Sequence, residues 1–295
     1  MDLNGIRSIS CNFGDLDQEI SSLKKSKFMV LSIPYEQTTS YKAGTKEGPK
    51  AILDASRYIE LYDEELDKCS YEAGIYTIGE MLIDHSGPAQ MINKIYNNVK
   101  NFIDRDKILI SIGGEHSITP GLVKAHKDIY PDISVLQLDA HADLRQEYEG
   151  TEFSHASAIR RVLEFCPAVQ AGIRSISYEE AEFYKTTDRT RIFFAKDLKK
   201  DLKAYLNKIV DFLTDSVYIT IDLDVFDPSI MPAVGTPEPG GIDWYEILDI
   251  LKFVIDRKKI IGIDMVELLP QKENIASDFL AAKLIYKLIG YIDKK

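Results

Sequence analysis

Seven short, nearly continuous apolar segments alternate with segments of helical periodicity, and this alternation constrains the fold more than any other feature of the sequence. The apolar segments are 27–34, 108–114, 133–141, 168–173, 191–195, 217–224 and 260–267. Apolar runs without a polar alternation are typical of parallel strands that are buried on both faces. The segments with helical periodicity are 49–61, 89–103, 119–130, 157–165, 202–213, 244–256 and 276–292. The pattern predicts an α/β fold, in which helices cover both faces of a parallel sheet.

The rest of the chain favours one domain and a cytoplasmic protein. No low-complexity linker or internal repeat divides it, so we expect a single domain over residues 1–295. The net charge of −11 argues against a nucleic-acid binder or a protein of anionic membranes. Three widely spaced cysteines without a CxxC pair predict reduced thiols. The start of the chain lacks the layout of a signal peptide, and no apolar run reaches the roughly 18 residues of a membrane span.

Acidic and imidazole groups gather where four of the expected strands end. These ends carry the motifs "GGEHS" (113–117), "DAHAD" (139–143), "DLDVFDP" (222–228) and "VELLP" (266–270). Ligands of open parallel sheets bind beyond the carboxyl ends of the strands. Taken singly, each of the first three motifs also fits a polar turn or a helix cap. Because three independent strand ends would need the same coincidence, we expect one functional site.

The spacing within two of these motifs suits convergence on one point. In extended backbone, residues two apart point the same way, which aligns Asp139 with His141 and Asp143, and Asp222 with Asp224. Four carboxylates within a few ångströms would repel one another, and two divalent cations would offset that charge. Carboxylate and imidazole ligands without a thiolate suit Mn²⁺, Fe²⁺ or Zn²⁺, and we expect Mn²⁺. A metal pair lowers the pKa of bound water, so a hydrolase is the expected class.

Two further residues are candidates for the chemistry. His155, in "FSHAS", stands before an expected helix, where it could shuttle protons or have no catalytic role. Glu267 could pair with a guanidinium in bidentate fashion or form a supporting salt bridge. The loop 227–241, rich in Pro and Gly, could border the mouth of the site or a subunit contact. The residues alone leave these alternatives open.

The five motifs "GGEHS", "DAHAD", "SHAS", "TIDLDVFDP" and "VELLP", in this order and spacing, resemble the ureohydrolase (arginase/agmatinase) family, most closely its bacterial and archaeal agmatinases. Residues 41–53 and 169–175 extend the resemblance over most of the chain. It implies a three-layer α/β/α arginase-like fold, with a central parallel sheet of about eight strands and two Mn²⁺ per subunit. It also implies a homo-oligomer, usually a trimer or hexamer.

The resemblance also implies a role for each matched residue. The metal ligands would be His116, Asp139, His141, Asp143, Asp222 and Asp224, with Asp139 and Asp222 bridging. His155 falls on the general acid/base histidine, and Glu267 falls on the glutamate that orients the guanidinium. A metal-bridging hydroxide would attack the guanidinium carbon, and Asp143 would relay a proton to the leaving amine. Glu115 replaces the aspartate common in the first motif, and we expect this departure to be neutral.

The segments that resemble the family's substrate-binding loops predict the substrate. Arginases hold the α-carboxylate and α-amino group with an Asn/Ser-rich loop and with aspartates. Here 144–157 has no asparagine, and Ser175 and Ser177 stand where aspartates are expected. An unpaired buried carboxylate is costly, so we expect agmatine, a small cationic guanidino compound, to be hydrolysed to putrescine and urea.

Other substrates and other classes of protein stay open. Arginase activity is one alternative, and guanidinobutyrate or formimidoylglutamate could be accepted if Arg145 or Arg174 paired with their carboxylate. A single-metal, deacetylase-like amidohydrolase is a less favoured reading, because it has no use for His116 as a ligand of a second metal. A metal-binding protein without activity is a third class, and no sequence feature supports it.

Overall fold

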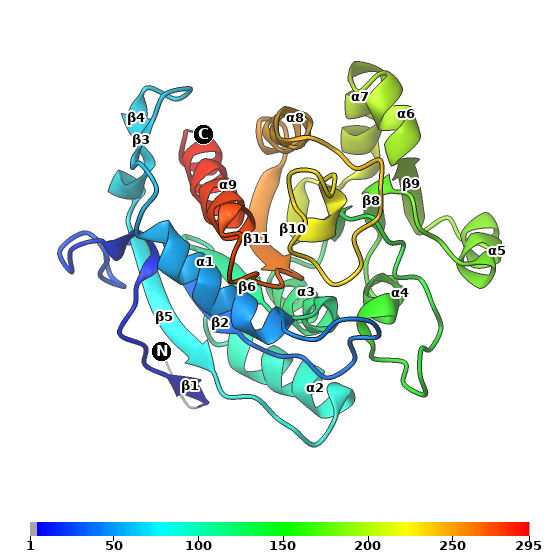
Figure 1. Cartoon of the computed structure of the whole chain (residues 1–295), viewed down its shortest axis with the longest axis horizontal. Coiled ribbons are helices and arrows are strands. Elements are labelled where there is room, and N and C mark those ends of the chain that lie inside the picture. The colour runs from blue at the N-terminus through cyan, green and yellow to red at the C-terminus, as the bar shows by residue number, and fades with distance from the viewer. Residues whose placement is uncertain (1–4, 295) are drawn as a thin grey trace.

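A nine-stranded sheet forms the centre of the computed structural model, which describes residues 5–294 (Figure 1). Its strands, in spatial order, are β1 (Ile6–Arg7), β5 (Ile75–Met81), β2 (Phe28–Ile33), β6 (Ile108–Gly113), β11 (Lys259–Val266), β10 (Ser216–Asp222), β7 (Ile133–Leu138), β8 (Ala168–Ile173) and β9 (Thr190–Phe194). Only β1 is antiparallel among the sheet's described strands. The two short strands β3 (Tyr62–Asp63) and β4 (Lys68–Cys69) pair separately. The α/β prediction, with a largely parallel sheet, is confirmed.

Helices cover both faces of the sheet and make three layers (Figure 1). One face packs against α1 (Gly48–Ser56), α6 (Ala195–Lys200), α7 (Lys203–Phe212), α8 (Trp244–Ile255) and α9 (Ala276–Asp293). The other face packs against α2 (Pro88–Val99), α3 (Thr119–Ile129), α4 (Ala158–Val162) and α5 (Tyr178–Thr186). Along β2, Val30 belongs to the first core and Leu31 to the second. This alternation explains why the central strands are apolar at nearly every position.

The sequence patterns missed the elements with mixed polarity. β5 is only partly buried, since it lies next to the edge strand β1, and its residues give no continuous apolar run. In α5, Glu180 is the only buried residue, so helical periodicity is weak. The helix expected over 49–61 ends at Ser56, and that expected over 157–165 is the shorter α4.

The topology gathers the strand ends that carry the motifs. The strands β6, β11, β10 and β7 are consecutive neighbours, and β11 lies between β6 and β10 although it comes last in sequence among the strands of residues 5–294. All four run in the same direction. Their carboxyl ends therefore meet at one edge of the sheet. Within residues 5–294, the structure contains no helix that is both long and apolar enough to cross a membrane.

Candidate active site

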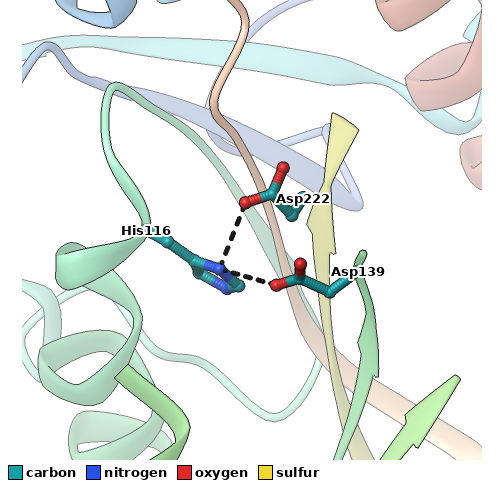
Figure 2. A group of neighbouring side chains, drawn as sticks. All are labelled: His116, Asp139 and Asp222. Carbon is teal, nitrogen blue, oxygen red and sulfur yellow. Dashed lines mark ion pairs between the residues drawn. The ribbon is translucent and has the colours of Figure 1, made fainter. Parts of the chain in front are cut away.

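Two clusters of His and Asp side chains lie at the carboxyl ends of the central strands. His116, Asp139 and Asp222 form one, and Asp139, His141 and Asp224 form the other. In each cluster, one donor atom from every residue lies within 4.8 Å of the others. Figure 2 shows the imidazole of His116 facing the carboxylates of Asp139 and Asp222 with one ring nitrogen. Asp139 is common to both clusters, which suits a pair of neighbouring cations.

The surroundings of His116 fit a cation. Its Nδ1 lies 3.1 Å from Asp139, 3.0 Å from Asp143 and 3.4 Å from Asp222, measured to a carboxylate oxygen in each case. Yet among the described residues this buried nitrogen has no hydrogen-bond partner of acceptable geometry. The other ring nitrogen, Nε2, is 2.9 Å from the hydroxyl of Thr220. A buried nitrogen that faces three carboxylates without a hydrogen bond is arranged as a metal ligand would be.

The second histidine is held by a carboxylate. His141 Nδ1 lies 2.8 Å from Asp224 Oδ2. Burial opposes the charged form of His141, but the charges of Asp224 and its neighbours raise the pKa of this histidine to about 11. Burial likewise opposes ionisation of Asp224, and the contact with His141 lowers its pKa to about 2. The imidazolium of His141 thus balances the charge of Asp224, and a cation bound at Nδ1 would take the place of that proton.

The carboxylates of Asp139 and Asp222 are destabilised as anions. Burial, followed by repulsion from Asp224 and Asp143, raises the pKa of Asp139 to about 7. Burial and the charges of Asp224 and Asp139 also raise the pKa of Asp222 well above its ordinary value. The protein alone therefore does not neutralise this cluster. Divalent cations would offset the charge that burial and repulsion make costly.

Two candidate residues occupy unusual backbone conformations. Asp143 has φ 51° and Glu267 has φ 68°, a region that side-chain-bearing residues seldom adopt. Glu267 follows β11, and its N–H donates to Gly114 O at 2.8 Å, while its Oε1 accepts from His116 N at 2.7 Å. These bonds tie the ends of β6 and β11 together. Such strain is common at functional sites, where surrounding contacts hold it in place.

A cavity of about 170 Å³ opens over the clusters. Its lining includes ten of the residues singled out in the sequence: His116, His141, Asp143, Arg145, His155, Ser175, Ser177, Asp222, Asp224 and Glu267. Asp139, which is fully buried, lies outside this lining. Gly235 and Thr236 also line it, so the loop 227–241 borders the mouth. The structure thus brings the candidate residues together, while their individual roles stay predictions.

The two arginines proposed as carboxylate partners differ in position. Arg174 donates to the backbone oxygens of Asp224 at 2.7 Å and Glu238 at 2.8 Å, and it does not line the cavity. Arg145 lines the cavity, with its guanidinium 5.0 Å from the centre of the Tyr148 ring. Arg174 therefore connects the backbone at Asp224 to the backbone at Glu238. Of the two arginines, only Arg145 is placed to contact a substrate carboxylate.

Comparison with known proteins gives the family. Residues 26–290 match the arginase family. The chain belongs to the arginase family. It is 39% identical to the N(1)-aminopropylagmatine ureohydrolase of Synechocystis sp. over 281 residues, which cover 93% of this chain and 92% of that protein. It is 33% identical to the agmatinase of Halalkalibacterium halodurans, over 92% of this chain and 94% of the other. The solved agmatine ureohydrolase of Thermoplasma volcanium superposes with a TM-score of 0.85 at 30% identity, over 99% and 97% of the two chains.

In this arginase-family chain, the sequence did not indicate the contacts of one residue beside the site, Glu115. Glu115 was expected to be a neutral replacement for aspartate, but its side chain is fully buried and accepts hydrogen bonds from Gln37 N, Thr38 N and Thr38 Oγ1, each at 2.7 Å. It therefore fixes the loop that follows β2, part of which lines the cavity. No local signal in the sequence connects residues so far apart along the chain.

Proposed function

We propose that this chain is an agmatinase, which hydrolyses agmatine to putrescine and urea. The observation that carries the proposal is the cavity, in which the strand-end His and Asp side chains share one pocket with Ser175 and Ser177. At these two positions the resemblance places aspartates in arginine-binding sites. A site of this kind suits a guanidino compound that ends in an amine and carries no carboxylate.

The donor set fits two Mn²⁺ ions. Oxygen and imidazole ligands suit this metal, and the unpaired Nδ1 of His116 and the acidic excess around Asp139 both favour a cation. The residues that would hold the ions are His116, Asp139, Asp143, Asp222, His141 and Asp224, and Asp139 belongs to both clusters. When bound, the metal pair would supply a water of lowered pKa for attack on the guanidinium carbon.

The protein side chains would orient the substrate and move protons. Glu267 lines the cavity and would pair with the guanidinium, because its carboxylate is held by His116 N at a fixed position. Asp143 would carry a proton to the leaving amine. His155 lines the same cavity at the start of a 3₁₀ turn (His155–Ser157) and would exchange protons with bulk water.

A second candidate substrate is N(1)-aminopropylagmatine, which carries the same guanidinium on a longer polyamine. The names of several relatives at 34–39% identity favour it. The reaction would be the same, and the substrate would differ only at the amine end. Guanidino compounds with a carboxylate fit the cavity less well, because only one of the two candidate arginines, Arg145, lines it and could pair with that carboxylate.

The deciding experiment measures urea release by Mn²⁺-loaded protein with agmatine, N(1)-aminopropylagmatine, arginine and guanidinobutyrate in parallel. We expect the highest kcat/KM with agmatine. A higher kcat/KM with N(1)-aminopropylagmatine would make that compound the substrate, and the proposed hydrolysis of the guanidinium group would stand. No urea from any of them, together with one metal per chain, would favour the single-metal amidohydrolase.

We further propose that the chain is a cytoplasmic homo-oligomer, a trimer or hexamer, built from a single domain. Cys11, Cys69 and Cys166 are free thiols, which supports a reducing compartment. The resemblance supports the assembly. Light scattering of the purified protein tests the subunit number, and limited proteolysis tests the single domain.

A further inference from the structure

A partly buried hydrogen-bond chain leads from the fully buried Glu115 through Thr38 to His155. The Oγ1 atom of Thr38 lies 2.7 Å from Glu115 Oε1 and 3.2 Å from His155 Nδ1. The same oxygen accepts the backbone N–H of His155 at 3.0 Å. Thr38 therefore contacts both the ring and the backbone of a histidine that lies 117 positions away in the sequence.

The direction of each hydrogen bond follows from the number of protons available. Glu115 receives four donors, namely Gln37 N, Thr38 N, Thr38 Oγ1 and Ser117 Oγ, at 2.5–2.7 Å. A buried carboxylate surrounded by donors acts as an acceptor. The single hydroxyl proton of Thr38 thus points to Glu115, and its oxygen is left to accept from His155. Two donors from His155, its backbone N–H and its Nδ1–H, satisfy that oxygen.

This polarity fixes the proton on the imidazole. Since Nδ1 donates to Thr38, the neutral ring of His155 carries its proton there and keeps Nε2 as its acceptor. We infer that Thr38 and Glu115 are positioning residues, which hold His155 in the tautomer and orientation needed for proton transfer in the cavity. The inference rests on the proposed function, in which His155 carries protons.

The loop that carries Thr38 is anchored at two points. Glu115 holds Gln37 and Thr38, and Oε2 of Glu36 accepts from Gly44 N at 2.5 Å and from Thr45 Oγ1 at 3.0 Å. Residues 39–42 between these anchors line the cavity. The ring of Tyr148 contacts His155 edge-on, with 5.8 Å between the ring centres. His155 is thus supported on one side by a fixed hydroxyl and on another by an aromatic ring.

The test is a double-mutant cycle with Thr38→Val and His155→Asn, measured by urea release with saturating and limiting agmatine. Val keeps the shape of Thr and removes its hydroxyl. We expect Thr38→Val to lower kcat roughly tenfold to a hundredfold with little change in KM. In the His155→Asn background, the same substitution should cause no further loss. Thr38→Ser, which restores the hydroxyl, should regain most of the wild-type kcat.

The matched control is Thr214→Val, because Thr214 Oγ1 bonds Ser134 Oγ at 3.0 Å and Ser216 O at 2.9 Å at the opposite end of the sheet. We expect this variant to keep wild-type kcat. If Thr38→Val leaves kcat unchanged, or lowers it equally in both backgrounds, the inference is overturned while the proposed function stands. If the wild-type protein releases no urea from any of the four guanidino compounds, the proposed function and the inference that rests on it both fail.

Discussion

His141 and Asp224 are 83 positions apart in the sequence, yet His141 Nδ1 lies 2.8 Å from Asp224 Oδ2. They follow the adjacent strands β7 and β10, and Asp139 joins them in one of the two His/Asp clusters. The contact therefore arises from strand order rather than from local sequence. It places an imidazole where it can either balance a carboxylate or bind a cation.

Replacing His141 with Ala should remove one of the two metal sites. We expect the metal content of purified, Mn²⁺-loaded protein to fall from about two ions per chain to about one, because the cluster that contains Asp224 loses its only nitrogen ligand. Metal analysis by mass spectrometry measures this. His85→Ala, at an exposed position, is the control and should keep both ions. Unchanged metal content in His141→Ala would contradict the proposed ligand set.

Glu267→Gln should impair substrate binding without removing metal. The Gln oxygen can still accept from His116 N, so the local structure should be kept, but the charge that would pair with a guanidinium is lost. We expect kcat/KM for agmatine to fall roughly a hundredfold. Steady-state kinetics and metal analysis of the same preparation check both parts. A variant with wild-type kcat/KM would show that Glu267 does not bind the guanidinium.

Ser177→Asp should shift substrate preference toward arginine. Ser177 is the N-cap of α5, where its hydroxyl accepts from Glu180 N, and Asp is an equally good N-cap. The new carboxylate lines the cavity, where it could bind an α-amino group. We expect the kcat/KM ratio of arginine to agmatine to rise about tenfold. An unchanged ratio would mean that this position does not contact the amine end of the substrate.

Lys287→Met should destabilise the fold far from the active site. Lys287 Nζ lies 2.8 Å from Asp63 Oδ1 and 3.1 Å from Glu65 Oε2, and it joins α9 to the hairpin of β3 and β4. The substitution leaves the carboxylate of Asp63 buried without its cation, at a cost of about 3 kcal/mol in unfolding free energy. Urea denaturation measures the loss. Lys283→Met, at a partly exposed position on the same helix that makes no ion pair with Asp63 or Glu65, should have little effect.

Acid should weaken the same contact in a defined range of pH. Burial disfavours the charged form of Glu65, but hydrogen bonds from Lys252, Tyr291 and Lys287 lower its pKa to about 2. Because the pKa is lower in the folded than in the unfolded chain, the stabilisation is complete above about pH 5 and is lost as the pH falls toward 2. The wild-type protein and Lys287→Met should therefore differ less in stability at low pH. A constant difference across this range would contradict the argument.

The sequence predicted those parts of the fold and site that depend on local patterns. Central strands such as β7 and β10 are buried at nearly every position and mostly apolar, and the acidic residues at their carboxyl ends are conspicuous. β5 and α5 were missed because partial exposure mixes their polarity, although Ser177 and Glu180 form a capping box that marks the start of α5. The contacts of Glu115 could not be predicted, for another reason. Its partners Gln37 and Thr38 lie in a distant loop, and only the tertiary structure brings them together.

The position of β11 determines when, during synthesis of the chain, the central sheet and the site at its edge can form. This strand comes last in sequence among the described strands but separates β6 from β10, so its backbone bonds join the half of the sheet that carries His116 to the half that carries Asp222. During synthesis, the two halves have no common strand between them until residues 259–266 leave the ribosome. The proposed metal ligands are therefore all synthesised before the strand that brings the two halves together, and a nascent chain can assemble the site only after β11 has left the ribosome.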